Sequence, residues 1–369
     1  MKILITGSKG FIGKNLVYEL KNRGFDDLME YDIDSDSGLL DAYTQECQFV
    51  YHLAGVNRPE NQDDFMKGNF GFTSLLLESL KNNNNKSPVL ITSSTQAATD
   101  NPYGRSKKAG EDIVFEYGKE CGLPVYVYRL PNVFGKWCRP DYNSAVATFC
   151  NNIAHNLPIQ VNDPSVQMNL VYIDDVVSSF IDKLNINGES LNQYEEVHPV
   201  YSVKLGDIVS LIYEFKESRN NLLISDMDDA FTKKLYSTYL SYLPKNEFAY
   251  PLKMIIDQRG SFTEFLKSKE RGQVSVNVFK PNITKGNHWH HTKNEKFLVV
   301  SGKGVIRFRK VDSNEVLEYF VSGDCLTVVD VPVGYTHNIE NLGETDMVMI
   351  IWVNEVFEKN RPDTFFEEV

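Results

Sequence analysis

The first thirteen residues contain a glycine-spaced turn, and this turn limits the possible fold more than any other feature of the chain. Gly7, Gly10 and Gly13 lie in the stretch ITGSKGFIG, between the apolar run KILIT and Phe11–Arg23, whose apolar spacing is helical. A strand that enters a helix through such a turn brings its backbone close to a pyrophosphate, and the helix N–H groups favour that negative charge. The alternative is an incidental glycine-rich turn, but the strand–turn–helix context favours a dinucleotide site.

Strand-like and helix-like runs alternate from Met1 to about Asn192. Strand patterns follow in DLMEYDI, FVYHLAG, PVLITSS and PVYVYRL, while Asn69–Lys81 and Ser106–Gly122 have helical apolar spacing. This alternation is typical of a parallel sheet covered by helices. The first part of the chain is therefore predicted to be an α/β domain.

The pattern changes near Met254, where short alternating stretches begin. QVSVNVF, EKFLVV, GVIRFR, EVLEYFV and DCLTVVDV are separated by Gly, Asn, Asp and Pro residues, which is typical of an all-β barrel or sandwich. The 369 residues also exceed the usual size of one hydrophobic core. We therefore predict two domains, 1–245 and 246–369, with the boundary in Ser241–Pro251.

The composition argues against several classes of protein. A net charge of −12 without a cluster of Lys and Arg argues against a nucleic-acid partner. No apolar run approaches the roughly 20 residues of a membrane span, and the N-terminus lacks the pattern of a cleaved signal. The five cysteines form no CxxC pair, which suits a reducing compartment. We expect a cytoplasmic protein without a membrane or nucleic-acid partner.

A second set of residues in the first half indicates ketone reduction. Tyr103 and Lys107 in YGRSK are four apart at the start of a helix, so both side chains lie on one face. An ammonium beside a phenol stabilises the phenolate, which makes Tyr103 a proton donor to a ketone oxygen that receives hydride. The hydroxyl of Ser93 or Ser94, at the end of the preceding strand, would hold that oxygen. A solvent-exposed helix start is the alternative.

Asp32 ends the second predicted strand, where a carboxylate can accept a hydrogen bond from a ribose 2′-hydroxyl. Taken alone, Asp32 favours NAD over NADP. The alternative is a solvated carboxylate beside Asp34 and Asp36.

Seven sequence blocks of the first half, taken in their order along the chain, resemble those of the extended short-chain dehydrogenase/reductase family, particularly its nucleotide-sugar epimerases and reductases. The matching blocks are TGSKGFIG, HLAG at His52–Gly55, NFGFTSLL at Asn69–Leu76, ITSS, the Tyr103/Lys107 pair, RLPNVFG at Arg129–Gly135 and VYIDDV at Val171–Val176. The likeness spans residues 1–240 and implies a Rossmann-type fold. It implies that NAD(P) is bound by Gly7, Ser8, Lys9, Gly10, Phe11, Ile12, Gly13, Leu53, Ala54, Gly55, Tyr103, Lys107 and Pro131. The interval from Thr95 to Tyr103 is shorter than is usual in the family, so the choice between Ser93, preferred for its place after LIT, and Ser94 stays open.

Histidines are concentrated in one stretch of the second half. His288 and His290 are two apart, so in an extended strand they project to one face, while Trp289 and His291 face the other. Imidazoles that converge with a carboxylate such as Glu295 can hold a divalent ion and leave room for water or substrate. A lone histidine would be a core residue, and a one-residue register shift would exchange His290 for His291.

The spacing of these residues resembles both conserved motifs of the cupin family, a double-stranded β-helix barrel. The two stretches are GNHWHHTKNEKFLVVSG and VPVGYTHNIEN. The resemblance implies ligands for a metal, with zinc as our expectation, at His288, His290, Glu295 and His337. DQRGSFTEF at Asp257–Phe265 is similar to the opening of cupin-type deoxysugar-nucleotide epimerases, which abstract a proton beside a 4-keto group. A turn with paired charges is the alternative for this segment.

Together the two halves resemble a family of bacterial capsular-polysaccharide enzymes. The resemblance implies C3 epimerisation of a UDP-2-acetamido-2,6-dideoxy-hexos-4-ulose in a zinc cupin, then NADPH-dependent reduction of the C4 ketone to UDP-N-acetyl-6-deoxy-L-talosamine. Epimerisation comes first because reduction removes the acidity that it requires. The family also implies a homodimer. NADPH conflicts with Asp32 taken alone, so Lys9 and Arg58 are candidate partners of the 2′-phosphate and NADH is the alternative.

Two other functions are compatible with the same residues. One is a monofunctional 4-keto-sugar-nucleotide reductase whose metal-bound barrel is structural or dimerising. The other is a metal-dependent dioxygenase barrel fused to an unrelated reductase.

Overall fold

The computed structural model describes residues 1–185 and 193–369, and the chain divides into two compact units. The first unit comprises Met1–Ile212 and Lys233–Pro244, and the second comprises Tyr213–Thr232 and Lys245–Val369. None of the helices within the described ranges combines the length and the apolar character that a transmembrane span requires.

A six-stranded parallel sheet forms the centre of the first unit, with the strand order β2-β1-β3-β4-β5-β8. The strands are β1 (Ile3–Thr6), β2 (Leu28–Tyr31), β3 (Phe49–His52), β4 (Val89–Ser94), β5 (Val125–Leu130) and β8 (Gln193–Glu195). Every residue of β1 and β3 is buried, which is why these strands are continuous apolar runs rather than alternating ones. The sheet confirms the predicted α/β Rossmann-type fold.

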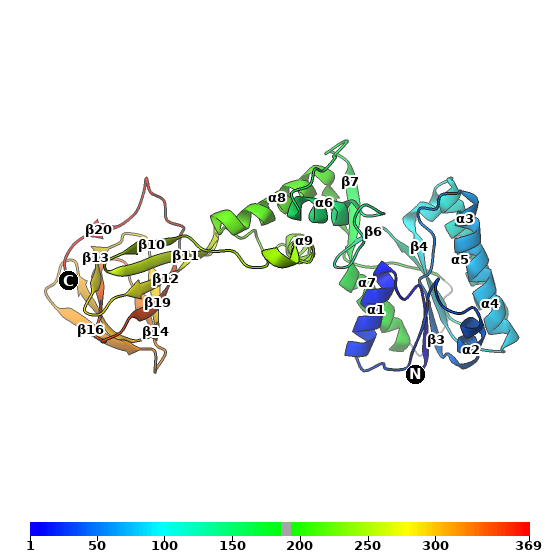
Figure 1. The fold of residues 1–369 in the computed structure, drawn as a ribbon, viewed down its shortest axis with the longest axis horizontal. Helices are drawn as coiled ribbons and strands as arrows, with labels where there is room; N and C mark the ends of the chain where they lie inside the picture. The colour runs from blue at the N-terminus through cyan, green and yellow to red at the C-terminus, as the bar shows by residue number, and fades with distance from the viewer. Residues whose placement is uncertain (186–192) are drawn as a thin grey trace. The chain divides into compact units, whose positions relative to one another are not determined.

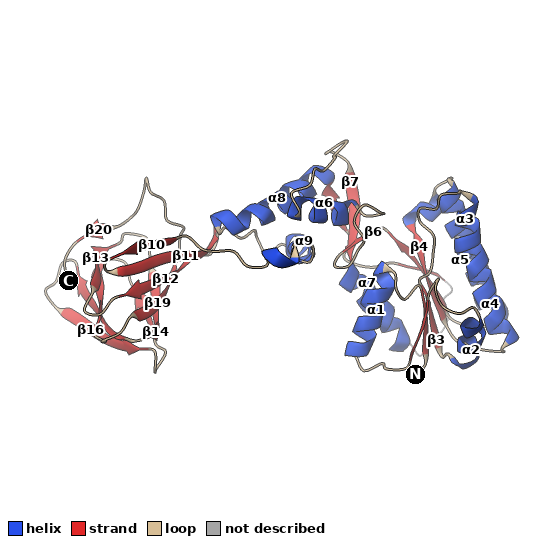
Figure 2. Ribbon diagram, viewed as in Figure 1, coloured by secondary structure: helices blue, strands red, loops and turns tan. Residues whose placement is uncertain are grey.

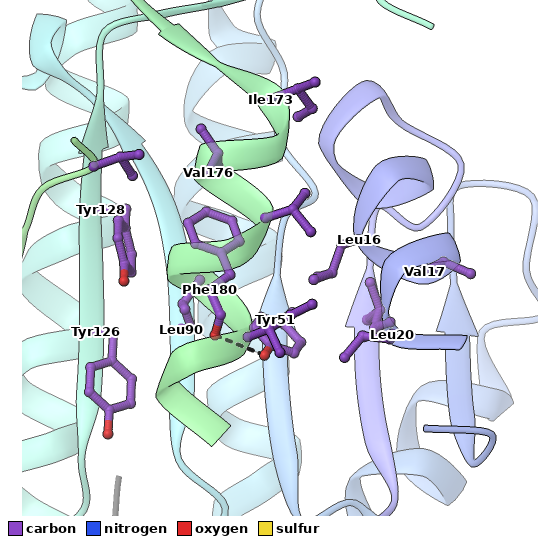
Figure 3. Packing of buried hydrophobic residues seen from close by; sticks show 14 of the residues in the cluster. Leu16, Val17, Leu20, Tyr51, Leu90, Tyr126, Tyr128, Ile173, Val176 and Phe180 are labelled. Atoms are coloured by element: carbon purple, nitrogen blue, oxygen red, sulfur yellow. Dashed lines mark hydrogen bonds between the residues drawn. The ribbon is translucent and has the colours of Figure 1, made fainter. Parts of the chain in front are cut away.

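Helices cover both faces of this sheet (Figure 1). One face carries α1 (Phe11–Asn22) and α7 (Ile173–Asp182), and the other carries α2 (Gly38–Glu46), α4 (Phe72–Asn82) and α5 (Pro102–Cys121). Leu16, Tyr51 and Phe180 belong to one buried cluster on the first face (Figure 3). The Tyr51 hydroxyl donates a hydrogen bond to the Phe180 carbonyl at 3.0 Å, so the polar end of this buried ring is satisfied.

The helix that carries the predicted catalytic pair is longer than its apolar spacing indicates. The helical apolar spacing begins only at Ser106, but α5 begins at Pro102, because the Asn101 side chain accepts a hydrogen bond from the Gly104 N–H at 2.7 Å. The helix ends before Gly122, whose φ of 66° is the left-handed conformation common after helix C-termini. The longer helix places position 103 in its first turn.

The other elements of the first unit include a small sheet with the order β6-β7-β9. The helix that the sequence predicts from Asn69 is preceded by a π-helical turn, η1, which leads directly into α4. The bounds are α3 (Asp63–Phe65), η1 (Met66–Gly71), η2 (Thr95–Ala98), β6 (Asn132–Phe134), α6 (Ala145–Ala154), β7 (Gln167–Tyr172), η3 (Lys183–Asn185), β9 (Tyr201–Lys204), α8 (Leu205–Asn221) and α9 (Ala230–Leu240). The residues of α8 and α9 are divided between the two units.

From residue 254 onward the second unit forms two antiparallel sheets, drawn as red strands in Figure 2. Their orders are β10-β11-β12-β19-β14-β17 and β16-β15-β18-β13-β20. The bounds are η4 (Lys245–Glu247), β10 (Met254–Asp257), β11 (Gly260–Ser268), β12 (Gly272–Phe279), β13 (Thr284–Trp289), β14 (Glu295–Ser301), β15 (Lys303–Lys310), β16 (Val316–Ser322), β17 (Val328–Val331), β18 (Tyr335–Asn341), β19 (Met347–Val353) and β20 (Phe365–Phe366). Phe279, Phe297, Ile306 and Ile339 contribute to one core from both sheets. The arrangement confirms the predicted all-β cupin barrel.

A short segment before the predicted boundary pairs with the barrel. The Ile224 N–H donates to the Lys267 carbonyl at 2.9 Å, and the Lys267 N–H donates to the Leu222 carbonyl at 2.7 Å. Division at residue 245 assigns this segment to the first domain, whereas its backbone contacts group Tyr213–Thr232 with the barrel strands.

Candidate active sites

The glycine turn opens onto a cavity of about 690 Å³ in the first unit. Gly7 has a φ of 71°, and a Cβ atom there would lie 2.7 Å from the Ala54 nitrogen. A Cβ atom on Gly13 would lie 2.1 Å from the Gly7 carbonyl oxygen. Both positions therefore require glycine, because the turn packs backbone against backbone on one side and opens onto the cavity on the other.

Most of the residues predicted to bind the dinucleotide line this cavity, namely Gly7, Lys9, Gly10, Phe11, Ile12, Gly13, Leu53, Gly55, Tyr103, Lys107 and Pro131. Four predicted residues lie outside this lining. Ser8 is buried behind the turn, Ala54 packs against Gly7, and Arg58 is exposed on the loop after β3. Asp32 accepts a hydrogen bond from the Lys9 N–H at 2.7 Å.

Charged groups beside the turn already have partners. The Lys9 ammonium forms an ion pair with Asp34, and both side chains are well exposed to solvent. Asp32 also accepts a hydrogen bond from the Ile33 N–H at 2.8 Å. A 2′-phosphate bound by Lys9 would thus have to displace Asp34, whereas a 2′-hydroxyl could donate to Asp32 without that exchange.

Tyr103 and Lys107 both face the cavity from α5. The Tyr103 hydroxyl donates a hydrogen bond to Asn57 Oδ1 at 3.1 Å, and burial raises the pKa of Tyr103, with a hydrogen bond to Ser94 opposing that rise. The phenol is therefore neutral near pH 7 and has a proton to give. Asn57 is a cavity residue that the sequence reasoning missed, because no spacing rule connects it to position 103.

The Lys107 ammonium is buried and donates to the Thr92 carbonyl at 3.3 Å. It lies 6.0 Å from the centre of the Tyr103 ring. Burial lowers the pKa of Lys107 to about 8, while the charge of Glu111 acts in the opposite direction. A Cβ atom on Gly55 would lie 2.9 Å from this ammonium, so only the absence of a side chain at position 55 leaves room for the ammonium.

The two candidate serines have different surroundings. The Ser93 hydroxyl is buried and donates to Glu111 at 2.6 Å, and Glu111 also accepts hydrogen bonds from Arg129 at 2.7 Å and Tyr194 at 3.0 Å. Ser94 accepts a hydrogen bond from the Gln96 N–H at 3.2 Å and lies beside Tyr103. These contacts favour Ser94 over Ser93 as the hydroxyl that meets a substrate oxygen.

Further residues line the same cavity from the loop after β6. Trp137, Arg139, Tyr142 and Asn143 come from this loop, and Arg139 lies over the Tyr142 ring at 5.4 Å. No pattern in the sequence selects these side chains.

In the barrel, His288, His290, Glu295 and His337 converge so that their candidate ligand atoms all lie within 4.8 Å of one another. The His288 ring lies 5.0 Å from that of His290 and 4.6 Å from that of His337. Cross-strand pairing of His288 with His337 explains how residues far apart in sequence meet.

Strand alternation separates the fourth histidine from this cluster. The His291 ring lies 4.5 Å from Trp289 and 4.9 Å from Phe365. His291 is therefore part of an aromatic group on the opposite side of the strand, and the register shift considered from the sequence does not occur.

The protonation states of the cluster suit a divalent cation. The Nε2 atoms of His290 and His337 are buried and have no hydrogen-bond partner among the described residues. Burial lowers the pKa of His288 to about 4. Burial alone would raise the pKa of Glu295, but the imidazoles of His290 and His337, whose Nε2 atoms lie 3.7 and 3.3 Å from its carboxylate, lower it to about 2. Buried imidazole nitrogens without a hydrogen-bond partner, beside an ionised carboxylate, are the kind of ligands that bind zinc, so these residues fit the expected ion.

The hairpin similar to the epimerase opening has a simple local structure. Asp257 of β10 pairs with Gly260 of β11, and the Arg259 guanidinium pairs with Asp257 at 2.6 Å within the turn. Glu264 pairs with Lys267 at 2.8 Å on the same strand. The charges of this hairpin are thus paired with neighbouring residues, as expected for a simple turn with paired charges.

Comparison with known proteins assigns both halves of the chain. Residues 3–185 match the model of the NAD dependent epimerase/dehydratase family, and residues 255–365 match that of the polysaccharide biosynthesis C-terminal domain. The chain is 43% identical over 366 residues to UDP-2-acetamido-2,6-beta-L-arabino-hexul-4-ose reductase of Pseudomonas aeruginosa, and the match covers 99% of this chain and 98% of that protein.

Solved structures give the same result for the whole chain. The capsular polysaccharide assembling protein CapF from Staphylococcus aureus is 54% identical with a TM-score of 0.93, and the match covers 100% of both chains. A structure of CapF with the inhibitor 3-isopropenyl-tropolone is 50% identical with a TM-score of 0.89, again over 100% of both chains. The chain therefore belongs to the family of this nucleotide-sugar reductase and of CapF, in which an epimerase/dehydratase domain precedes a polysaccharide biosynthesis C-terminal domain.

Proposed function

We propose that this chain carries out two consecutive reactions on a UDP-linked 4-keto sugar. The barrel epimerises C3 of a UDP-2-acetamido-2,6-dideoxy-hexos-4-ulose, and the first unit then reduces the C4 ketone with NADPH to give UDP-N-acetyl-6-deoxy-L-talosamine for capsular polysaccharide. The observation that carries the proposal is the presence of two separate chemical clusters, Tyr103/Lys107 in one unit and the histidines in the other. The name of the Pseudomonas aeruginosa relative, a reductase of a UDP-linked hexul-4-ose, supports the substrate class.

The reduction uses the residues around Tyr103. When bound, the reduced nicotinamide supplies a hydride to C4 of the sugar. Tyr103, kept neutral by burial, gives its proton to the oxygen that becomes the C4 hydroxyl. Ser94 holds that oxygen in place, and Lys107 adds a positive charge at the floor of the cavity.

The epimerisation requires removal of the C3 proton and its return from the opposite face of the ring. The electron pair left at C3 moves onto the C4 ketone oxygen as an enolate, which needs a stabilising positive group. His288, His290, Glu295 and His337 would hold a zinc ion, which when bound supplies Lewis acidity in the barrel. The two buried Nε2 atoms without partners support this ligand set.

The resemblance to capsular-polysaccharide enzymes also suggests the reductant, the compartment and the oligomeric state. We propose NADPH as the reductant, with NADH as the alternative that the contacts of Asp32 and Lys9 support. We also propose that the enzyme acts in the cytoplasm as a homodimer. Five cysteines, none of them paired among the described residues, agree with a reducing compartment.

Deuterium exchange tests the division of labour. The zinc-loaded protein is incubated with the 4-keto sugar in deuterated water without NADPH, and the sugar is examined by mass spectrometry and NMR. We expect one deuterium at C3, and no exchange above background after removal of the metal. An intact, metal-loaded protein that gives no label at C3 would contradict the epimerase half of the proposal.

A monofunctional reductase is the second candidate, and one observation favours it. The name of the Pseudomonas aeruginosa relative, which matches 99% of this chain, mentions reduction alone. In that case the barrel would stabilise the protein or join two copies, and reduction would proceed without any exchange at C3. The deuterium experiment therefore separates the two candidates.

A further inference from the structure

The last residues of the chain fold back onto the strand that carries the metal ligands. β20 pairs with β13, so that Phe366 lies opposite His288 and Phe365 lies opposite Trp289. The Glu367 N–H extends this pairing, since it donates to the Asn287 carbonyl at 3.0 Å. A segment that begins at Pro362 thus follows the outer edge of the histidine strand.

One residue of this segment contacts a ligand histidine directly. The Nδ1 atom of His290 lies 2.6 Å from the main-chain carbonyl oxygen of Asp363. A carbonyl can only accept, so this contact places the imidazole proton on Nδ1 and leaves the Nε2 lone pair free. Nε2 is the buried atom that faces Glu295, at 3.7 Å from its carboxylate. Partners of this kind fix the ring orientation and the tautomer of metal-binding histidines.

The Asp363 side chain holds its own carbonyl in this position. Its carboxylate accepts hydrogen bonds from three consecutive backbone N–H groups, those of His291 at 3.1 Å, Thr292 at 2.9 Å and Lys293 at 2.9 Å. These residues immediately follow His290. Asp363 therefore binds the backbone that follows His290 through its carboxylate, and it orients the His290 ring through its carbonyl.

Two further observations show how closely this contact is determined. Asp363 has a φ of 41°, a left-handed conformation that is uncommon outside glycine and persists where the surroundings fix it. The buried Lys293 ammonium donates to the Pro362 carbonyl at 2.5 Å. The carbonyls of two consecutive residues, Pro362 and Asp363, thus contact the stretch from His290 to Lys293.

We propose that Asp363 is a positioning residue of the barrel metal centre, and that the segment Pro362–Glu367 is part of that centre rather than a passive tail. The proposal rests on the proposed function, because it presumes that the histidine cluster binds a divalent ion. If Asp363 has this role, a bound ion stabilises the docked segment, and the docked segment in turn raises the affinity for the ion.

Metal affinity is the direct test, measured on the full-length protein with zinc in competition with a chelator. Asp363→Ala removes the grip on the loop, and we expect zinc affinity to fall about 10- to 100-fold, the range found for outer-shell partners of metal ligands. Asp363→Asn keeps one acceptor oxygen, so its zinc affinity should lie between those of the unaltered protein and Asp363→Ala. Asp312→Ala is the matched control, because Asp312 pairs only with neighbouring Lys310 in an exposed turn.

Cobalt provides a readout that general loss of stability would not produce. The visible absorption of the cobalt-substituted protein depends on ligand geometry, so it should change in Asp363→Ala and remain unaltered in Asp312→Ala. Zinc affinity and a cobalt spectrum that match those of the unaltered protein would overturn the role of Asp363 while leaving the metal centre intact. If the unaltered protein binds neither ion, the metal centre and this inference are both wrong.

A second measurement needs no variant and covers the case in which Asp363→Ala fails to fold. Hydrogen exchange of the Thr292 and Lys293 amides is followed with and without zinc. We expect slower exchange with zinc, because the ion stabilises the docked segment that protects these amides. Identical protection in both states would contradict the reciprocal coupling.

Discussion

Ser93 and Ser94 are neighbours on β4, and both line the cavity, but their hydroxyls have different partners. Ser93 is held by Glu111, whereas Ser94 lies beside Tyr103. We expect Ser94→Ala to lower kcat for ketone reduction about 100-fold, which is typical for the loss of one donor to a developing oxyanion. Ser93→Ala should leave kcat nearly unchanged and lower the free energy of unfolding by about 1 kcal/mol. Steady-state kinetics and urea unfolding measure both effects, and the reverse pattern in kcat would make Ser93 the catalytic residue.

Lys107 gives the reductase a predicted limit at alkaline pH. Burial lowers the pKa of its ammonium to about 8, below the ordinary lysine value. The charged fraction therefore decreases as the pH rises through 8, and kcat/KM for reduction should decrease with it. In Lys107→Met the overall rate should be lower and this alkaline limb should be absent. A pH profile of the unaltered protein that stays flat from 7 to 9 would contradict a loss of rate through deprotonation of Lys107 near pH 8.

Among the elements of the first unit, the glycine turn leaves little room for a larger side chain. Gly13→Ala would bring a Cβ atom to 2.1 Å from the Gly7 carbonyl, so the turn must open, at a cost of about 1–3 kcal/mol for overpacking. We expect NADPH affinity to fall at least about 10-fold, because the helix N–H groups no longer face the pyrophosphate. Fluorescence titration of NADPH measures the effect.

Gly71→Ala is the control for this prediction. A Cβ atom there would lie 3.8 Å from the Met66 carbonyl, an ordinary contact, and the residue is helical. Equal NADPH affinity in Gly13→Ala and Gly71→Ala would mean that the turn does not hold the cofactor.

Elements whose pattern is local could be predicted from the sequence, and those that depend on distant partners could not. The alternation that assigns His288 and His290 to one face needs only neighbouring residues, as does the glycine spacing of the first turn. The grip of Asp363 on His290 joins positions 73 residues apart, and β20 is only two residues long. No periodicity can reveal such contacts, and the same holds for the hydrogen bond between Asn57 and Tyr103.

At the scale of the whole molecule, the two proposed reactions should be separable by mutation. Tyr103→Phe removes the proton donor for reduction, and we expect kcat to fall at least about 100-fold, while deuterium exchange at C3 stays intact.

His290→Ala removes one ligand, so bound zinc and the thermal stability of the barrel should fall while NADPH binding is spared. Elemental analysis, calorimetry and NADPH titration give the readouts.

The results that would contradict this separation are specific. If Tyr103→Phe also lost C3 exchange, one unit would be performing both steps. Unchanged zinc content in His290→Ala would require a different set of ligands.

The placement of the tryptophans has a practical consequence for such experiments. The chain contains three of them. Trp137 lines the cavity of the first unit, and Trp289 lies within the histidine strand, 4.5 Å from the His291 ring and 5.1 Å from Phe365. Each candidate site thus has a tryptophan in it or on the strand that carries it. With Trp352 and one of the other two replaced by phenylalanine, the emission of the remaining indole would follow either nucleotide binding or metal loading in real time, without an added label.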